Sequence, residues 1–342
     1  MPPKPSLDKL LPPILNLLRA DPPNPYSAHQ KALTTTARLV RNGQPELACE
    51  ILFNVARELL KAGDTASGAE LGVRMIEIMG EAGVKVDDKS RASVTQLIAL
   101  TPPGPWRKKL SDAAVKWSSS PDCPPGDPQL QQYLGELSFK DGNFEVAEPH
   151  LLASGTRDAA RTLADMMYAW SSEGVDGPGA VGNYAVRGVL PWLAVSPPNL
   201  LAASTFLGQF LSLLSSPSSK IGSDFFIGAE GGVQLTTSST INFLQLAVAT
   251  VQRAPSPGTS PVQARGTDGG VAKEWQSLLH RYRRLAGDSG VLAQKDVHEC
   301  LEAISANIFL IPQRGGNDML QNLMGSLFGG GGGGLGALGA AR

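Results

Sequence analysis

The residue types that could support catalysis or bind a metal are few in this chain. His298 and Cys300 lie two positions apart in a predicted helix, which places them about 200° apart around its axis. Two ligands of one metal ion need to lie on the same face, so these residues do not form a metal pair. The HExxH and CxxC spacings typical of zinc sites do not occur. The sequence therefore predicts no metal site.

Other arrangements that could do chemistry are equally incomplete. His150 lies near Glu145 and Glu148, where a solvated or capping histidine is a simpler interpretation than a general base. The glycine run at 329–334 has no Lys-Ser/Thr after it, so it cannot form a phosphate-binding loop. No cofactor is expected, and the chain is predicted not to be an enzyme.

Composition narrows the classes of protein to which this chain can belong. The 342 residues carry a formal net charge of -1, with both signs interspersed. A nucleic-acid-binding protein needs a basic stripe, and the sequence shows no long basic block. The first residues, MPPKPSLDKLLPPIL, lack the apolar core of a secretory signal. Three widely spaced cysteines (Cys49, Cys123, Cys300) suit a reducing compartment, so we expect a soluble cytosolic protein.

One uncharged stretch raises the question of a membrane segment. No charged residue lies between Arg187 and Lys220, and 200–214 reads LLAASTFLGQFLSLL. These 15 residues are shorter than the roughly 20 that a membrane-spanning helix needs. The pattern favours a buried helix over a membrane helix.

Apolar residues recur with the 3.6-residue period of amphipathic helices along most of the chain. Glycines and proline pairs mark the ends of these stretches. The predicted helices cover 6–19, 26–42, 45–62, 65–82, 88–99, 104–118, 128–140, 143–154, 156–172, 177–194, 198–214, 238–253, 271–286 and 294–311.

The short connections between these helices predict antiparallel helical hairpins. Residues 37–56 and 134–153 share one pattern, in which an apolar helix ends near an Asn/Asp-Gly turn and a second begins at once. This pattern resembles degenerate tetratricopeptide repeats, although no strict 34-residue period is present. The predicted fold class is all-α: a right-handed α-solenoid of such hairpins, whose extended surfaces are suited to holding other proteins.

Three segments depart from the helical pattern. DFFIGAEGGVQL, within 224–236, predicts one small β-hairpin in the C-terminal half. Residues 254–270 are a polar loop rich in Pro, Gly, Ser and Thr. Residues 313–342 form a Gly-rich tail that is either flexible or carries a short docking helix. We expect a division into 1–155, 156–312 and the tail.

Polar side chains gather on the first long helix, in PYSAHQKALTTTARLVRNG. The simpler interpretation is a solvated face. The alternative is a docking surface that includes Asp64 and Glu70 from a later helix, since mixed-sign surfaces orient protein partners.

The same residues resemble the N-terminal repeats of the Golgi-to-ER traffic protein 4 family. The similarity covers YSAHQKALTTTARLVRNGQPELACEILFNVARELLKAGDTASGAEL, VKVDD (84–88), AAVKWSS (113–119), GDPQLQQYLGE (126–136), GNFEVAEPHLL (142–152), INFLQLAVATVQR (241–253) and IPQR (311–314). It extends in order over essentially the whole chain.

This resemblance implies a non-enzymatic scaffold in the post-translational targeting of tail-anchored membrane proteins to the ER. The N-terminal half would bind the targeting ATPase and favour its nucleotide-bound, client-ready state. The matching residues are Tyr26, His29, Gln30, Arg38, Arg41, Asp64 and Glu70. One position departs from the family pattern: Leu33 stands where the family usually has arginine, so a contact through that side chain is in doubt.

The resemblance also implies that the C-terminal half binds a ubiquitin-like adaptor, at the hairpin and the helix after it. The residues expected there are Phe225, Phe226, Ile227, Val233, Leu235, Phe243 and Leu244. We expect the adaptor, rather than this chain, to cover the edges of the hairpin. Two alternatives remain open: an adaptor of another assembly built from tetratricopeptide-like repeats, and a membrane-peripheral lipid-binding helical protein.

Overall fold

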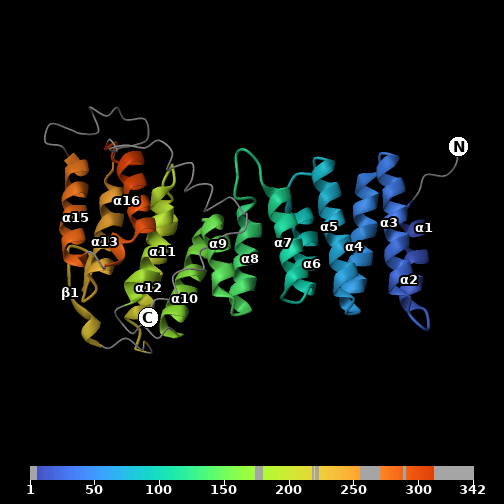
Figure 1. Ribbon diagram of the computed structural model, residues 1–342, viewed down its shortest axis with the longest axis horizontal. Helices are drawn as coiled ribbons and strands as arrows, with labels where there is room; N and C mark the ends of the chain where they lie inside the picture. Colours follow the sequence, from blue (N-terminus) through green and yellow to red (C-terminus); the bar gives the residue numbers. More distant parts are fainter. Residues whose placement is uncertain are drawn as a thin grey trace. The chain divides into compact units, whose positions relative to one another are not determined.

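The computed structural model describes residues 6–173, 180–217, 219, 223–254, 270–287 and 290–311. The chain divides into two compact units, Met1–Gly142 and Asn143–Arg342. Helices make up most of the described part of both units (Figure 1).

In the first unit, each long helix packs against the next helix and also against the one after it. For example, α3 contacts α4 and α5, and α4 contacts α5 and α6. This is the packing of stacked helical hairpins. The helices are α1 (Leu7–Leu10), α2 (Pro12–Arg19), α3 (Pro25–Arg41), α4 (Pro45–Lys61), α5 (Thr65–Glu81), α6 (Asp88–Leu100), α7 (Pro105–Ser118) and α8 (Pro128–Lys140).

Local sequence explains where these helices begin and end. Proline occupies the first turn of α3, α4, α7 and α8, where its missing N–H costs no hydrogen bond. The side chains of Asn24, Asp64 and Asp127 accept hydrogen bonds from the exposed N–H groups of α3, α5 and α8. Gly43 and Gly63 follow α3 and α4 with φ of 70° and 85°, a conformation that is strained for other residues.

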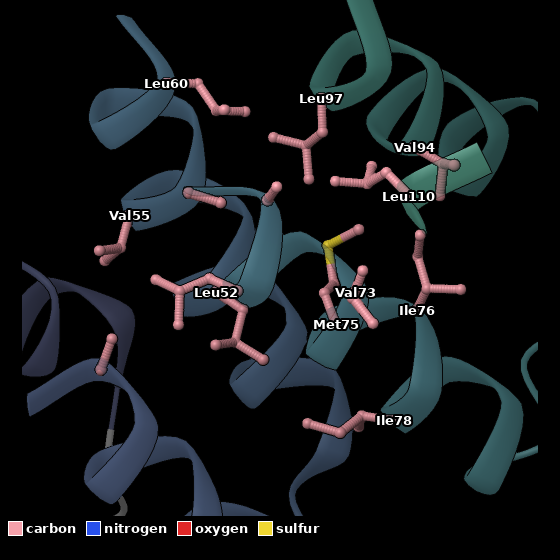
Figure 2. Packing of buried hydrophobic residues seen from close by; sticks show 14 of the residues in the cluster. Leu52, Val55, Leu60, Val73, Met75, Ile76, Ile78, Val94, Leu97 and Leu110 are labelled. Carbon is pink, nitrogen blue, oxygen red and sulfur yellow. The ribbon is translucent and has the colours of Figure 1, made fainter. Parts of the chain in front are cut away.

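The core of the first unit lies between neighbouring helices, as Figure 2 shows for α4 to α7. Leu97 of α6 and Leu110 of α7 are fully buried. Both approach α5 at Gly72, where an added Cβ would lie 3.2 Å from each leucine. A side chain at this position would require the two leucines to move by a few tenths of an ångström, so glycine suits this close packing.

The helix predicted over 6–19 is divided at Leu11 into α1 and α2. Pro12 and Pro13 supply no N–H groups to the carbonyl groups of Asp8 and Lys9, so a continuous helix would lack two hydrogen bonds.

The second unit contains the remaining helices and a two-stranded sheet. They are α9 (Phe144–Ser154), α10 (Arg157–Glu173), α11 (Val181–Ala194), α12 (Leu200–Leu214), β1 (Phe226–Glu230), β2 (Val233–Thr236), α13 (Ser239–Gln252), α15 (Gly270–Ala286) and α16 (Lys295–Asn307), with short 3-10 turns at Ser223–Phe225 and Val291–Ala293.

The uncharged stretch forms part of the core of this unit. Phe206 and Phe210 of α12 are fully buried, and α12 packs against α10 and α11. A Cβ at Gly188 of α11 would clash with the ring of Phe206, so these two helices are in very close contact. In the part of the chain that the structure describes, no helix is long and apolar enough to cross a membrane.

Aromatic side chains join α13, α15 and α16. The rings of Trp275 and Phe309 stack with centroids 4.9 Å apart, and Phe243 packs against Trp275. The indole Nε1 of Trp275 donates a hydrogen bond of 2.9 Å to Ser305 Oγ. The helix predicted to reach 311 ends at Asn307, because the chain turns with Leu310 at φ 53° and brings Phe309 onto Trp275.

The predicted β-hairpin is present. β1 and β2 pair antiparallel, with Glu230 opposite Val233 and Gly228 opposite Leu235. Gly231 and Gly232 form the two-residue turn with φ of 57° and 83°. Both central positions of a type I′ turn need positive φ, which explains the glycine pair.

The predicted fold class, helical hairpins with one inserted β-hairpin, is confirmed for the described residues. The first unit ends at Gly142, before the boundary predicted at 155, because α9 packs against α10 and α11. Most of the predicted loop over 254–270, the start of the helix predicted over 177–194, and the tail at 313–342 lie outside the described residues.

Candidate functional site

The side chains considered for catalysis are held in structural roles or have low reactivity. Glu148, beside His150, pairs with Arg187. Burial, with smaller contributions from Asp296 and Glu299, raises the pKa of the Cys300 thiol to about 11. Because the thiolate is the nucleophile, Cys300 is protonated and weakly reactive at neutral pH. Within the described ranges, no three His, Cys, Asp or Glu side chains gather as a possible metal site.

The predicted N-terminal docking residues lie mainly on the exposed side of α3. Tyr26 is 72% exposed, and Gln30, Arg38 and Arg41 are also exposed. Tyr26 offers a partner an apolar ring and a hydroxyl group, a combination common at protein interfaces. The exposed part of α3 is therefore aromatic at its start and basic at its end.

His29 lies on the other side of the same helix and is only 6% exposed. Its Nε2 is 3.3 Å from Oε2 of Glu70 on α5. Nε2 has no hydrogen-bond partner within the described residues, so its contact with Glu70 is an electrostatic one. Half of the Glu70 side chain is exposed, at 53%. His29 therefore links α3 to an acidic side chain that still reaches the surface.

The two remaining N-terminal positions have structural roles. The carboxylate of Asp64 accepts a hydrogen bond from the Ser67 N–H and begins α5. Leu33, at the position that departs from the family pattern, is partly buried against the core of the first unit. Leu33 therefore contributes an apolar contact to the core and offers no charge to a partner.

In the second unit, the hairpin is held against α13 by two side-chain amides. Gln245 accepts a hydrogen bond from the Gln234 N–H at 2.9 Å and donates one to its carbonyl oxygen at 2.7 Å. Asn242 does the same with the N–H and carbonyl of Thr236, at 2.9 and 2.7 Å. Each amide therefore pairs with a residue of β2 as a neighbouring strand would.

This arrangement corrects one expectation. The outer edge of β2 is covered by this chain's own α13, not left for a partner. Because backbone groups alternate along a strand, the N–H and carbonyl of Ala229 on β1 point away from β2. Within the described part of the chain, β1 has no neighbouring strand other than β2.

The predicted adaptor residues fall into three groups by exposure. Ile227 is 66% exposed. Phe226, Val233 and Leu235 are half-buried. The last group is buried within this chain and cannot form a surface without rearrangement: Phe225 at 6% exposed, and Phe243 and Leu244 at 0%.

Sequence reasoning missed Asn242 and Gln245. Their spacing of three residues, immediately after the hairpin, placed both on one face of a helix and could have indicated a shared role. The inward direction of His29 had a signal too. Ala28, Ala32 and Thr36, which share its side of α3, are also buried.

A helical-repeat protein is the class that these features define, because both units are built of packed helices. The family model of Golgi to ER traffic protein 4 matches residues 42–328. The chain belongs to the Golgi to ER traffic protein 4 family.

Relatives in this family match over very different lengths. The Golgi to ER traffic protein 4 of Aspergillus fumigatus is 29% identical over 322 residues, covering 89% of this chain and 86% of that protein. The Schizosaccharomyces pombe protein of the same name is 24% identical, and the match covers 90% of this chain and 92% of that protein. A human homolog is 27% identical over only 43% of this chain and 44% of that protein.

A solved structure supports the same conclusion. The crystal structure of Get4 from C. therm. is 28% identical to this chain and covers 98% of it, with 99% of that protein matched and a TM-score of 0.75. Identity and coverage of this size support family membership as well as a common fold.

Proposed function

We propose that this protein is a cytosolic, non-enzymatic scaffold in the targeting of tail-anchored membrane proteins to the ER. In this proposal the first unit binds the targeting ATPase and favours its nucleotide-bound, client-ready state. The second unit binds a ubiquitin-like adaptor. Membership of the Golgi to ER traffic protein 4 family supports the proposal. The two units also expose chemically different surfaces, as binding of two different partners would require.

The ATPase would contact the exposed residues of α3 together with Glu70. These side chains carry both signs of charge and one exposed aromatic ring, which suits an interaction that must form and dissociate. His29 is too buried to be a principal contact, so its contribution would pass through Glu70.

The adaptor would contact the hairpin at Ile227 and along the β1 edge. A partner would cover the exposed apolar side chain of Ile227. It would also form hydrogen bonds with the outward-pointing backbone groups of β1. An extended segment added to a strand edge supplies both hydrogen bonds and apolar contacts.

A pull-down with the targeting ATPase, with and without ATP, tests the first contact. We expect retention in ATP, reduced about tenfold or more by Glu70→Lys or Arg38→Glu. Glu77→Lys is the matched control, because Glu77 lies on the same helix and pairs only locally with Arg74. No retention in either nucleotide condition, or equal retention of all variants, would contradict the proposal.

Co-purification with the adaptor tests the second contact. Ile227→Asp should reduce adaptor recovery while leaving ATPase binding unchanged. Leu201→Asp is the control, since Leu201 is 62% exposed on α12 and takes no part in the hairpin. Equal adaptor recovery from both variants would show that the site lies elsewhere.

Neither alternative gains a supporting observation. The apolar residues that motivated a lipid-binding protein include Phe206, Phe210 and Leu214, which are buried inside the second unit. They are therefore not available to a lipid surface. An adaptor role in another assembly has no residue in its favour beyond the helical repeats.

A further inference from the structure

α15 carries a stripe of basic side chains. Lys273, His280 and Arg284 are exposed and lie within about 40° of one another around the helix, with Arg281 beside them. None of these four makes an ion pair with a described residue, whereas Glu274, the acidic residue of α15, pairs with Arg253 at 2.9 Å. We call these four side chains the α15 stripe.

The stripe borders a cavity between α15 and α16. The cavity has a volume of about 540 Å³ and is lined by His280, Arg283 and Arg284 from α15 and by Glu302 and Ser305 from α16, among others. It opens widely to solvent, so a side chain of a bound partner can enter it. Among the lining residues, cationic or ionisable nitrogen groups outnumber the one carboxylate.

The positive charge in the cavity is incompletely neutralised. Arg283 Nη2 is 3.7 Å from Glu302 Oε1, which is beyond hydrogen-bond distance. Nη2 also lies 2.9 Å from His298 Nδ1, and the buried Nε has no hydrogen-bond partner within the described residues. Arg283 and Glu302 are therefore paired only at long range, and a carboxylate bound in the cavity would add a shorter, hydrogen-bonded pair.

Stabilisation of the helix explains only part of this arrangement. Arg283 and Arg284 lie in the last turn of α15, where cations interact favourably with the helix dipole. Lys273 lies in the first turn, where a cation is unfavourable for the helix. The whole stripe therefore needs another explanation.

We propose that the α15 stripe and the adjoining cavity bind an acidic segment of a partner protein. Charge complementarity selects this occupant, with carboxylates pairing with Arg281 and Arg284 at the surface and with Arg283 in the cavity. The surface includes none of the hairpin residues assigned to the adaptor, so it is a separate contact of the second unit.

Nucleic acid and membrane are less suitable occupants. The facing helix α16 carries Asp296, Glu299 and Glu302, so the positive charge is confined to α15, and the stripe has too few cations to track a continuous phosphate backbone. A membrane surface would need apolar anchors beside the cations. Leu285, at 62% exposed, is the large exposed hydrophobic side chain on the described part of α15.

Fluorescence anisotropy with the full chain tests this proposal. The probe is a fluorescein-labelled peptide of alternating Glu and Ala, and its control has Gln in place of every Glu. We expect the Glu peptide to bind at low salt and the Gln peptide not to bind. Arg281→Glu/Arg284→Glu should weaken binding at least about tenfold.

The matched control is Arg157→Glu/Arg161→Glu, which makes the same charge change on α10, where both arginines are exposed. This variant should bind the Glu peptide like the unchanged protein. Arg283→Gln tests the cavity and should weaken binding without reversing a charge, with circular dichroism checking the fold of every variant. Absence of binding, equal loss in both double variants, or tighter binding of RNA or phosphatidylserine vesicles than of the peptide would overturn the proposal.

Discussion

The two candidate sites differ in how much each depends on a partner. At the candidate site on α3 and Glu70, the exposed side chains are charged or polar apart from Tyr26 and remain well solvated when nothing is bound. On the second unit, the hairpin exposes Ile227 and leaves one strand edge without a neighbour in its sheet. Charged contacts suit exchange, and an uncovered apolar edge suits a lasting partner.

The largest expected effect is on the free energy of unfolding, and it distinguishes a buried from an exposed side chain of the second unit. Phe243→Ala should lower the free energy of unfolding by about 3–5 kcal/mol, because the ring is fully buried against Trp275. Ile227→Asp should change it little, because that side chain is exposed. Urea unfolding followed by circular dichroism measures both, and similar losses would mean that Ile227 belongs to the core.

The second prediction concerns the amides that hold the hairpin. Replacing Asn242 and Gln245 with leucine removes four hydrogen bonds to β2. We expect local opening of the hairpin to become easier by about 2 kcal/mol. Hydrogen exchange at the Gln234 and Thr236 amides should accelerate, while exchange in α4 and α5 stays unchanged. Unchanged exchange in the hairpin would show that the side-chain amides of Asn242 and Gln245 do not hold the hairpin in place.

Salt should distinguish the two sites directly. Raising ionic strength screens exposed charges, so we expect binding of the ATPase to weaken by about tenfold, or about 1.4 kcal/mol. Binding of the adaptor, which is apolar and backbone-mediated, should change much less. Surface plasmon resonance across a salt series measures both, and parallel slopes would remove the distinction.

The smallest expected effect is the coupling between His29 and Glu70. A double-mutant cycle with His29→Ala and Glu70→Gln should give a coupling free energy of about 0.5 kcal/mol for folding. The value is small because half of the glutamate side chain is solvated. If His29 acts through Glu70, the same cycle in ATPase binding should be non-additive. Additive effects on binding would show that the two residues act separately.

Sequence reasoning succeeded where the determining interactions are local. Helix boundaries follow from residues such as Pro45, Asp64 and Gly63, and the hairpin turn follows from Gly231-Gly232, because each acts within a few residues of its own position. The proposed location of each site stays a prediction from the family resemblance, which also rests on contiguous stretches of sequence.

The exposure of individual site residues depended on contacts between distant elements. Phe243 was predicted to face a partner, yet it packs against Trp275, 32 positions away in the sequence. The partner of His29 lies on α5, and the cavity beside α15 exists only because α16 returns to that helix. Periodicity places a residue on a face of its helix but does not say which neighbour covers that face.

The amide pairs on β2 set a limit on stoichiometry. A hairpin with two open edges could accept a strand on each side and so begin a growing sheet between molecules. Asn242 and Gln245 occupy one side with groups from the same chain. Within the described residues, the β1 edge is therefore the one side of the hairpin at which we expect a strand to be added, which predicts one partner segment for each hairpin.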